Sequence, residues 1–499
     1  MTIYSQPPTT AIIIGAGFSG LTMACQLKRV FNLEDFYIYD RAEGIGGTWW
    51  SNTYPGCAVD IPAICYSLSF APNPNFTKLF PSQPEILDYV HDVASQYGVH
   101  SHFVGATEWR GARWQESTKT WTVTFENLRT GHIFTQRCKI LISGVGGLVN
   151  PNRFDVPGAQ NFKGDIVHTA RWNPNLDLTG KHVLVVGNGC SAAQLVPAIA
   201  DQTKTVTQFM RTPHHIMPSQ NYEISPTWRI IFRCVPGLLF LIRLLMFLYM
   251  ETGFLQFGKG KAESASRRSS AQLSAGHVRN TAPEKYWGLL TPDFEFGCKR
   301  RVFDHGYLNC LNRDNIRLTD DRIIHVKEHS VLTKSGDEIF AHAIILANGF
   351  ALTQWDVDIR GRNGITRKQH WEKYGSKSAF QSIAMSDFPN FFTLIGPNSG
   401  RAHTSTLLSI ESYTNLILSA IEPVLNGSAR SVEVKASSER RFNSDVHLAL
   451  EQMVQNASCA SYFIDKDTGK NWFVYPWNSL QLWWSTWRRC DDDWVYQKI

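Results

Sequence analysis

Two glycine-rich turns, each between an apolar run and a predicted helix, constrain the fold of this 499-residue chain most strongly. The first turn, Gly15-Ala16-Gly17-Phe18-Ser19-Gly20, follows the apolar residues 11–14 and precedes the amphipathic residues 21–30. A further apolar strand, residues 36–39, then ends in Asp40. This order of strand, glycine turn, helix, strand and acid is typical of a dinucleotide-binding unit, and less so of an ordinary strand–helix turn.

Each part of this first unit has a separate task. Gly15 makes the tight turn, and Gly17 lets the backbone approach a pyrophosphate at the helix N-terminus. Gly20 lets the helix lie close to the strand, and Asp40 accepts a hydrogen bond from a ribose hydroxyl. An acid at this point favours the free ribose of NAD or FAD.

The pattern recurs in the middle of the chain. Residues 182–186 lead into Gly187-Asn188-Gly189-Cys190-Ser191-Ala192 and a predicted helix to about Ala200. The next strand, residues 205–210, ends in Arg211-Thr212 where the first unit has its acid. Because an arginine suits a ribose 2′-phosphate, the sequence predicts an α/β fold with two Rossmann-like domains, one for FAD and one for NADPH.

The order of these signals predicts how the chain divides. We expect the FAD-binding domain in two parts, residues 1–147 and 344–499. The NADPH-binding domain is expected at 148–213 and 298–343, interrupted by a helical insertion at 214–297.

The oddest piece of the predicted insertion is residues 238–250, LLFLIRLLMFLYM, which is apolar all round except for Arg243. At 13 residues it is too short to span a bilayer unaided. We predict a helix buried beneath the insertion, and contact with a membrane surface is the less favoured alternative.

Composition excludes several other classes of protein. Lys and Arg number 49 against 43 Asp and Glu, with no basic run, so nothing indicates nucleic-acid binding. The 10 cysteines form no CxxC pair and the histidines show no metal-ligand spacing, so we expect no metal. The first residues do not resemble a signal peptide. We therefore expect a cytoplasmic monomer with free thiols.

A flavin and a nicotinamide in one chain leave three broad reactions: disulfide reduction, simple dehydrogenation or activation of oxygen. The first needs a cysteine pair beside the flavin, and the absence of a CxxC pair makes it the least favoured of the three.

Residues 162–173, FKGDIVHTARWN, resemble the FxGxxxHxxxW(P/D) fingerprint of Baeyer–Villiger monooxygenases. Phe162, Gly164, His168 and Trp172 match it, whereas Asn173 replaces the final Pro or Asp. Flavin monooxygenases that oxygenate nitrogen or sulfur carry a similar string, usually with another aromatic residue where Trp172 stands.

Other segments resemble the same family along nearly the whole chain. They are GGTWW at 46–50, YPGCAVD at 54–60, GCKR at 297–300 and LANGF at 346–350. The chain length is similar to that of fungal members that act on polyketides and other secondary metabolites.

The resemblance implies an enzyme that uses FAD, NADPH and O₂ to convert a ketone into an ester or lactone through a peroxyflavin. It implies that Arg300 holds the anionic oxygen and that Asp60 orients Arg300. A guanidinium suits this task because it cannot lose its proton and donates two parallel hydrogen bonds. An N- or S-oxygenating or hydroxylating flavin monooxygenase is the first alternative. A catalytically silent flavoprotein is the second, and the intact second glycine motif and Arg211 argue against it.

The same correspondence implies the residues that hold the cofactors. Those for FAD are Gly15, Gly17, Gly20, Asp40, Thr48, Trp49 and Asp60. Those for NADPH are Gly187, Gly189 and Ala192 at the pyrophosphate, with Arg211, Thr212 and Lys299 at the 2′-phosphate. His168 belongs to a hinge between the two nucleotide domains in this family, and a purely structural histidine is an equal alternative.

Overall fold

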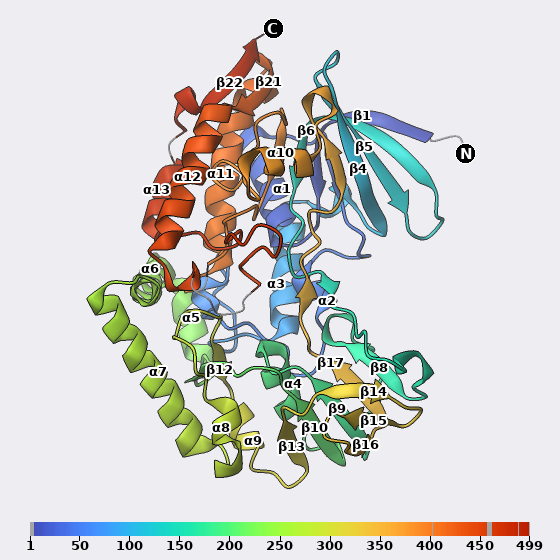
Figure 1. Ribbon diagram of the computed structural model, residues 1–499. Helices are drawn as coiled ribbons and strands as arrows, with labels where there is room; N and C mark the ends of the chain where they lie inside the picture. The colour runs from blue at the N-terminus through green and yellow to red at the C-terminus, as the bar shows by residue number, and fades with distance from the viewer. Residues whose placement is uncertain (1–3, 402, 457–461, 488, 499) are drawn as a thin grey trace.

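The computed structural model describes residues 4–401, 403–456, 462–487 and 489–498, and it contains two main β-sheets that lie apart from each other (Figure 1). The first sheet has eight strands in the order β19-β4-β5-β6-β1-β2-β3, with β20 beside β6. Their bounds are β1 Tyr4–Ile14, β2 Phe36–Tyr39, β3 Phe103–Val104, β4 Thr107–Gln115, β5 Thr120–Asn127, β6 Ile133–Ser143, β19 Asp358–Arg360 and β20 Phe391–Thr393.

Strand β1 lies at the centre of this first sheet, parallel to both β2 and β6. Its apolar end at residues 11–14 is buried on both faces. Ala11 and Ile13 pack in the cluster that contains α1 (Phe18–Phe31), and Ile12 and Ile14 pack in the cluster that contains β4 and β5. A fully apolar run is what a central parallel strand requires, since both of its faces are covered.

The second sheet is parallel throughout and has the order β13-β10-β9-β17-β8. Its strands are β8 Asp165–His168, β9 His182–Val186, β10 Thr205–Phe209, β13 Ile316–Thr319 and β17 Ala343–Leu346. Helix α4 (Cys190–Ile199) follows β9, and a small antiparallel sheet of β14 (Ile323–Val326), β15 (Ser330–Thr333) and β16 (Glu338–Phe340) lies beside it. The prediction of an α/β fold with two Rossmann-like units is confirmed.

The chain passes between the two sheets twice, and the two passages pair with each other. Strand β7 (Asn150–Pro151) runs antiparallel to β18 (Phe350–Ala351). The predicted domain boundary at residue 344 is wrong, because Ile344 pairs with both Leu184 and Ile166 inside the second sheet. The apolar residues of β17 are buried as a central strand of that sheet, so the chain leaves it only after Leu346.

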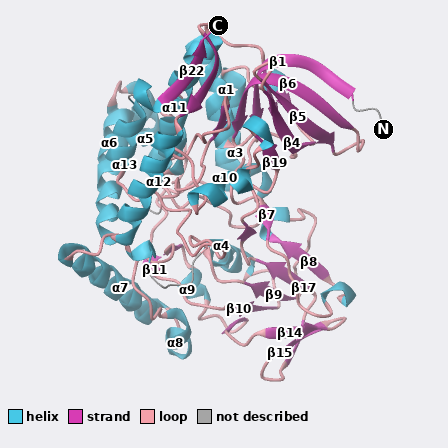
Figure 2. Ribbon diagram, turned by 45° about the horizontal axis from the view of Figure 1, so that its top comes forward, coloured by secondary structure: helices cyan, strands magenta, loops and turns pink. Residues whose placement is uncertain are grey.

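Helices dominate the predicted insertion, as Figure 2 shows. They are α5 Pro226–Cys234, α6 Leu238–Glu251, α7 Lys261–Thr281 and α8 Trp287–Leu290. A short strand within it, β11 (Ile216–Pro218), pairs with β12 (Val302–Asp304) just beyond it.

Residues 238–250 form a helix as predicted, but the prediction that this helix is buried is wrong. Every residue of α6 is at least partly exposed, and Phe240 and Tyr249 are 71% and 74% exposed. The reason is Arg243, whose Nη1 donates a 2.7 Å hydrogen bond to the carbonyl oxygen of Ser67. Because the polar side chain faces the protein, the apolar side chains opposite it face outward.

The remaining helices lie over the first sheet or at the junction between the sheets, except α9, which lies beside α4 at the second sheet (Figure 1). They are α2 Thr48–Ser51, α3 Gln83–Gln96, α9 Tyr307–Cys310, α10 Arg367–Tyr374, α11 Thr406–Leu425, α12 Ala436–Glu451 and α13 Ser479–Trp487. Strands β21 (Ala429–Val434) and β22 (Trp494–Lys498) form an antiparallel pair beside α11, with α12 and α13 between them in the sequence.

Candidate active site

The first glycine turn has no room for side chains. Gly15 adopts a φ of +98°, and a Cβ there would lie 2.8 Å from the carbonyl oxygen of Gly144. A Cβ on Gly20 would collide with the carbonyl oxygen of Gly15, and one on Gly17 would lie 3.4 Å from the Cα of Gly47. Within the described residues, no side chain caps the first turn of α1 and no acid stands in it. Its free N–H groups and partial positive charge suit a pyrophosphate.

Asp40 follows β2 and lies beside this turn. Its two carboxylate oxygens accept hydrogen bonds from the backbone N–H groups of Ala16, at 2.6 Å, and Ala42, at 2.8 Å. Burial raises the pKa of Asp40, and these two hydrogen bonds oppose that effect. The turn and the acid are therefore directly joined, which places the carboxylate beside the turn that would hold the pyrophosphate.

Thr48 and Trp49 begin α2, which starts where Gly47 approaches the first glycine turn. The indole Nε1 of the buried Trp49 donates a 3.1 Å hydrogen bond to the hydroxyl of Tyr66. The structure therefore places both predicted residues next to Gly17.

The second glycine turn repeats the first. Gly187 has a φ of +126°, and a Cβ there would collide with the carbonyl oxygen of Ala347. Gly189 precedes α4, whose first turn has neither a side-chain cap nor an acid within the described residues. Ala192 is fully buried beneath that turn. This helix N-terminus is equally suited to an anionic group.

Arg211 and Lys299 come from distant parts of the chain and lie close together. Burial lowers the pKa of Lys299, and the positive charge of Arg211 lowers it further. Neither residue forms an ion pair with the part of the chain that the structure describes. The ammonium of Lys299 lies 4.5 Å from the ring centre of Phe294. Two like charges held together in this way suit a doubly charged phosphate.

Thr212 contributes to the same region through its backbone. Its carbonyl oxygen accepts a 2.8 Å hydrogen bond from the side-chain amide of Asn188, which belongs to the second glycine turn. The segment that follows β10 is therefore tied to the turn that follows β9.

Arg300 and Asp60 form an ion pair between the two nucleotide-binding units. The distance from Nη2 of Arg300 to Oδ2 of Asp60 is 2.5 Å, and their side chains are 45% and 21% exposed. The carboxylate of Asp60 raises the pKa of Arg300. Cys190, the first residue of α4, lies close to Arg300. Burial raises the pKa of the Cys190 thiol, and the positive charge of Arg300 partly offsets this rise. A permanently charged guanidinium thus lies where the two units meet.

The fingerprint segment is attached to the connection between the sheets. His168 ends β8, and its Nε2 lies 3.1 Å from the carbonyl oxygen of Gly349. Its Nδ1 accepts a 3.1 Å hydrogen bond from the N–H of Ala170, so Nε2 carries the proton and donates to Gly349. Burial lowers the pKa of His168, which favours this neutral form.

The other fingerprint residues pack around this contact. A Cβ on Gly164 would collide with the carbonyl oxygen of His342, while Phe162 and Trp172 pack at the edges of apolar clusters. The ring centre of Phe350, in β18, lies 5.7 Å from that of His168. The fingerprint therefore holds the passage between the sheets.

Several residues of this region escaped the sequence analysis. Tyr66 connects Trp49 to the vicinity of Asp60 and Arg300, and a lone tyrosine carries no spacing signal. His214 is half-buried near Lys299 and Arg211, and desolvation lowers its pKa. Tyr54 donates a 2.7 Å hydrogen bond to Gln194 of α4, and its place in the YPG segment was the only signal for it.

Among the described residues, one cysteine departs from expectation. Cys298, which precedes Lys299 and Arg300, is disulfide-bonded, so the prediction that all thiols are free is wrong. Sequence spacing did not show this, because a disulfide depends on which distant segments the fold brings together. No cluster of three or more metal-ligating side chains occurs among the described residues.

Comparison with known proteins bears on the same region. Residues 13–81, which contain the first glycine turn and Asp60, match a family model described as an NAD(P)-binding Rossmann-like domain.

Curated relatives match along nearly the whole chain. A Baeyer–Villiger monooxygenase of Streptomyces coelicolor is 32% identical over 468 residues, which cover 93% of this chain and 88% of the relative. One from Pseudomonas aeruginosa is also 32% identical and covers 93% of this chain and 87% of the relative. An FAD-binding monooxygenase of Botryotinia fuckeliana is 30% identical, with 95% and 92% covered.

Solved structures share the fold. Cyclohexanone monooxygenase from a Rhodococcus species, bound to NADP⁺, aligns with a TM-score of 0.86 at 22% identity over 100% of both chains. An oxidised steroid monooxygenase bound to NADP aligns with a TM-score of 0.83 at 24% identity, over 99% of this chain and 100% of the other.

Proposed function

Because the chain belongs to the Baeyer–Villiger monooxygenase family of flavoproteins, we propose that it binds FAD and NADPH and inserts one oxygen atom of O₂ next to a ketone carbonyl. The product is an ester or lactone, and the second oxygen atom leaves as water. The single observation that carries this proposal is the Arg300–Asp60 ion pair, held where the two nucleotide-binding units meet.

The residues present fit both cofactors. The uncapped N-terminus of α1, together with Asp40, Thr48 and Trp49, would hold FAD. The N-terminus of α4, with Arg211 and Lys299, which form no ion pair within the described residues, would hold NADPH by its pyrophosphate and 2′-phosphate. When bound, the reduced flavin supplies the activated oxygen.

Arg300 would stabilise the negative charge that oxygen carries in this reaction. Its guanidinium stays protonated, and Asp60 raises its pKa further. Asp60 accepts a hydrogen bond from Nη2 and the Cys190 thiol contacts the same guanidinium, which has five N–H donors and so retains others for an anionic oxygen. A fixed charge that needs no reorganisation during the reaction is worth several kcal/mol, because it is already oriented.

His168 would act as a positioning residue. It joins the fingerprint to the connection between the sheets, so it would couple movement of one nucleotide unit to the other without touching a reacting atom. Its hydrogen bonds and lowered pKa argue against a role in proton transfer.

We further propose that the ketone is an intermediate of fungal secondary metabolism and that the enzyme works as a monomer. The similarity to FAD-binding monooxygenases of two fungi, Botryotinia fuckeliana and Aspergillus niger, supports the fungal setting.

Incubation of the holoenzyme with NADPH, isotopically labelled O₂ and a panel of ketones tests the reaction. We expect products heavier by one labelled oxygen atom, which mass spectrometry detects, from at least one cyclic or bulky ketone. Parallel incubations with amines and sulfides are the comparison. Oxygenation of those compounds with no ester or lactone from any ketone would contradict the proposal and favour an N- or S-oxygenating enzyme.

A further inference from the structure

Helices α5, α6 and α13 carry an apolar surface that the proposed reaction does not use. Both Figure 1 and Figure 2 place the three helices on one flank of the molecule. The backbone N–H of Ser479, at the start of α13, donates a 2.6 Å hydrogen bond to Glu251, at the end of α6. We call this the apolar flank and define it by its exposed side chains: Trp228, Ile230, Phe240, Leu241, Leu244, Leu245, Leu248, Tyr249, Leu480, Trp483, Trp484 and Trp487.

From this surface we infer that the protein docks on an anionic lipid bilayer, with α6 lying in the plane of the membrane surface. The readout that tests this is lipid binding, so the inference does not depend on the reaction catalysed.

The orientation of α6 is the first argument. Arg243 turns toward the protein, where it donates to Ser67 and lies 3.7 Å from the carboxylate of Glu411. On the outer face, Leu241, Leu245 and Leu248 are 50%, 57% and 44% exposed. A helix surrounded by water places its charged face outward and its apolar face inward. In α6 the charged side chain of Arg243 points inward while these leucines are exposed, which is what an apolar surrounding favours.

The aromatic side chains are the second argument. Trp483, Trp484 and Trp487 of α13 are 44%, 56% and 54% exposed, and Trp228 of α5 is 51% exposed. Tryptophan and tyrosine concentrate at the boundary between lipid and water because their rings are apolar at one end and polar at the other. A contiguous apolar patch of this kind marks a site of association.

Charge decides between lipid and an apolar protein partner. Residues 224–250 contain three arginines and no acid. Arg243 is turned inward, so the positive charge of this segment comes from α5, where Arg229 is half-exposed and Arg233 is exposed and donates a hydrogen bond to Asn75. Anionic lipid headgroups attract basic side chains beside an embedded apolar face.

The anchoring of α6 favours docking over spanning. Residues 238–256, which comprise α6 and the 3₁₀ helix η5 (Thr252–Gln256), have the length and composition of a membrane span. However, Arg243 in the middle and Glu251 at the end are both held by the rest of the protein. Crossing a bilayer would leave these groups in hydrocarbon, which is costly.

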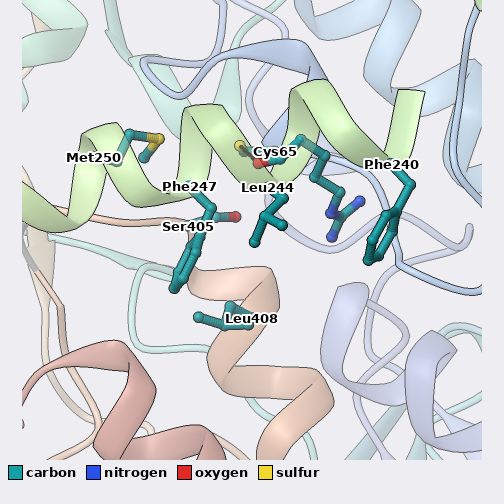
Figure 3. A pocket seen from close by; sticks show the side chains of 8 residues that line it. Cys65, Phe240, Leu244, Phe247, Met250, Ser405 and Leu408 are labelled. Carbon is teal, nitrogen blue, oxygen red and sulfur yellow. Dashed lines mark hydrogen bonds between the residues drawn. The ribbon is translucent and has the colours of Figure 1, made fainter. Parts of the chain in front are cut away.

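A hollow of about 130 Å³ opens on the same flank, between α6 and the start of α11. Figure 3 shows Phe240, Leu244 and Phe247 of α6 around it, with Ser405 and Leu408 on the opposite side. Because its lining is mainly apolar, it suits a hydrocarbon group at a lipid surface better than water.

Sedimentation of the holoenzyme with vesicles tests the inference. We use phosphatidylcholine vesicles with and without about one third phosphatidylserine. The unmodified protein is expected to pellet with the anionic vesicles.

The triple variant Leu241→Ser, Leu245→Ser, Leu248→Ser is expected to lower the partition coefficient at least about tenfold, since each change removes half-exposed apolar surface. Arg229→Gln and Arg233→Gln should each weaken binding to the anionic vesicles about fivefold and leave binding to neutral vesicles unchanged.

A matched control carries three serines at equally exposed apolar positions on other faces: Ile133→Ser, Ile324→Ser and Phe340→Ser, at 43%, 44% and 51% exposure. It should bind vesicles as the unmodified protein does, and both triple variants should retain bound flavin, which shows that they fold.

Equal binding by the two triple variants would overturn the inference, and so would no binding by the unmodified protein. A concentration-dependent dimer in sedimentation velocity, lost in the first triple variant without any vesicle binding, would assign the flank to a second copy. Resistance to alkaline carbonate extraction would assign α6 to a membrane span instead.

Discussion

At the scale of single residues, Arg211 and Lys299 decide which coenzyme the second nucleotide unit can bind. Their charges lie close enough for Arg211 to lower the pKa of Lys299. A bound 2′-phosphate would relieve this repulsion, since an opposite charge favours the ionised form of both groups.

Arg211→Ala is therefore expected to raise the KM for NADPH about tenfold or more, because one charge-assisted contact is worth roughly 1.5–3 kcal/mol. Use of NADH should barely change. Steady-state oxidation of both coenzymes measures this, with Arg317→Ala, an exposed arginine of β13, as the control. Equal loss with NADPH and NADH would defeat the assignment.

The second prediction for single residues concerns Arg300, whose role in oxygen transfer depends on its guanidinium and on the carboxylate of Asp60. Arg300→Ala should lower the rate of ester formation by about 10²–10³ or more while FAD stays bound. NADPH oxidation should continue and release hydrogen peroxide. Arg300→Lys should recover little, since a lysine lacks the planar fork.

Asp60→Ala should act in the same direction by less, because Asp60 orients Arg300 and tunes its charge. The measured quantities are ester yield, hydrogen peroxide and bound flavin. Ketone conversion by Arg300→Ala near the unmodified rate would show that the active site lies elsewhere.

At the scale of elements, the carboxylate of Glu251 joins α6 to α13 and to His403. Burial opposes ionisation of Glu251, but the hydrogen bonds from His403 and Ser479 outweigh it and lower the pKa of Glu251 from 4.5 to about 2. The side chain is only 12% exposed, so solvent screens this interaction little.

A carboxylate with a lowered pKa stabilises the folded state fully above its unfolded pKa, and the contribution is lost as the pH falls from 4.5 toward about 2. Glu251→Gln should therefore lower the free energy of unfolding by about 2–3 kcal/mol at pH 7. The difference from the unmodified protein should shrink over that acidic window. Urea denaturation followed by tryptophan fluorescence measures it, and a difference that does not vary with pH would attribute the loss to packing instead.

At the scale of the whole molecule, the two sheets are joined by the antiparallel pair β7 and β18, and His168 binds that junction through Gly349. The ion pair of Arg300 and Asp60 spans the same junction from residues 240 positions apart. The relative placement of the two nucleotide units therefore depends on a few contacts near the passage between them.

His168→Ala should lower the ratio of oxygenated product to NADPH consumed while leaving flavin content unchanged. His168→Gln, whose amide provides both a donor and an acceptor, should recover part of the coupling. Product yield, NADPH consumption and flavin absorbance give the three readouts. Loss of flavin in His168→Ala would show that the histidine is a structural residue only.

The features that the sequence determined by itself are those imposed by local sterics and short-range order. Gly15, Gly20 and Gly187 are required because a Cβ would collide with a backbone carbonyl at each turn. The buried run before each turn and the residue after the next strand complete a unit of about 30 residues. Two Rossmann-like units, their contrasting Asp40 and Arg211, and the family resemblance were therefore readable without a structure.

Only the tertiary structure decided how distant segments meet. Nothing local pairs Arg300 with Asp60, places Lys299 beside Arg211 or adds Tyr66 to the site, because long-range packing sets these contacts. Long-range pairing also placed β17 in the second sheet, because its apolar run suits a central strand of either sheet. In α6 the apolar residues surround the helix and indicate no inner face. The hydrogen bond from Arg243 to Ser67 selects that face and turns the leucines outward, since an arginine near the protein interior must find its acceptors there.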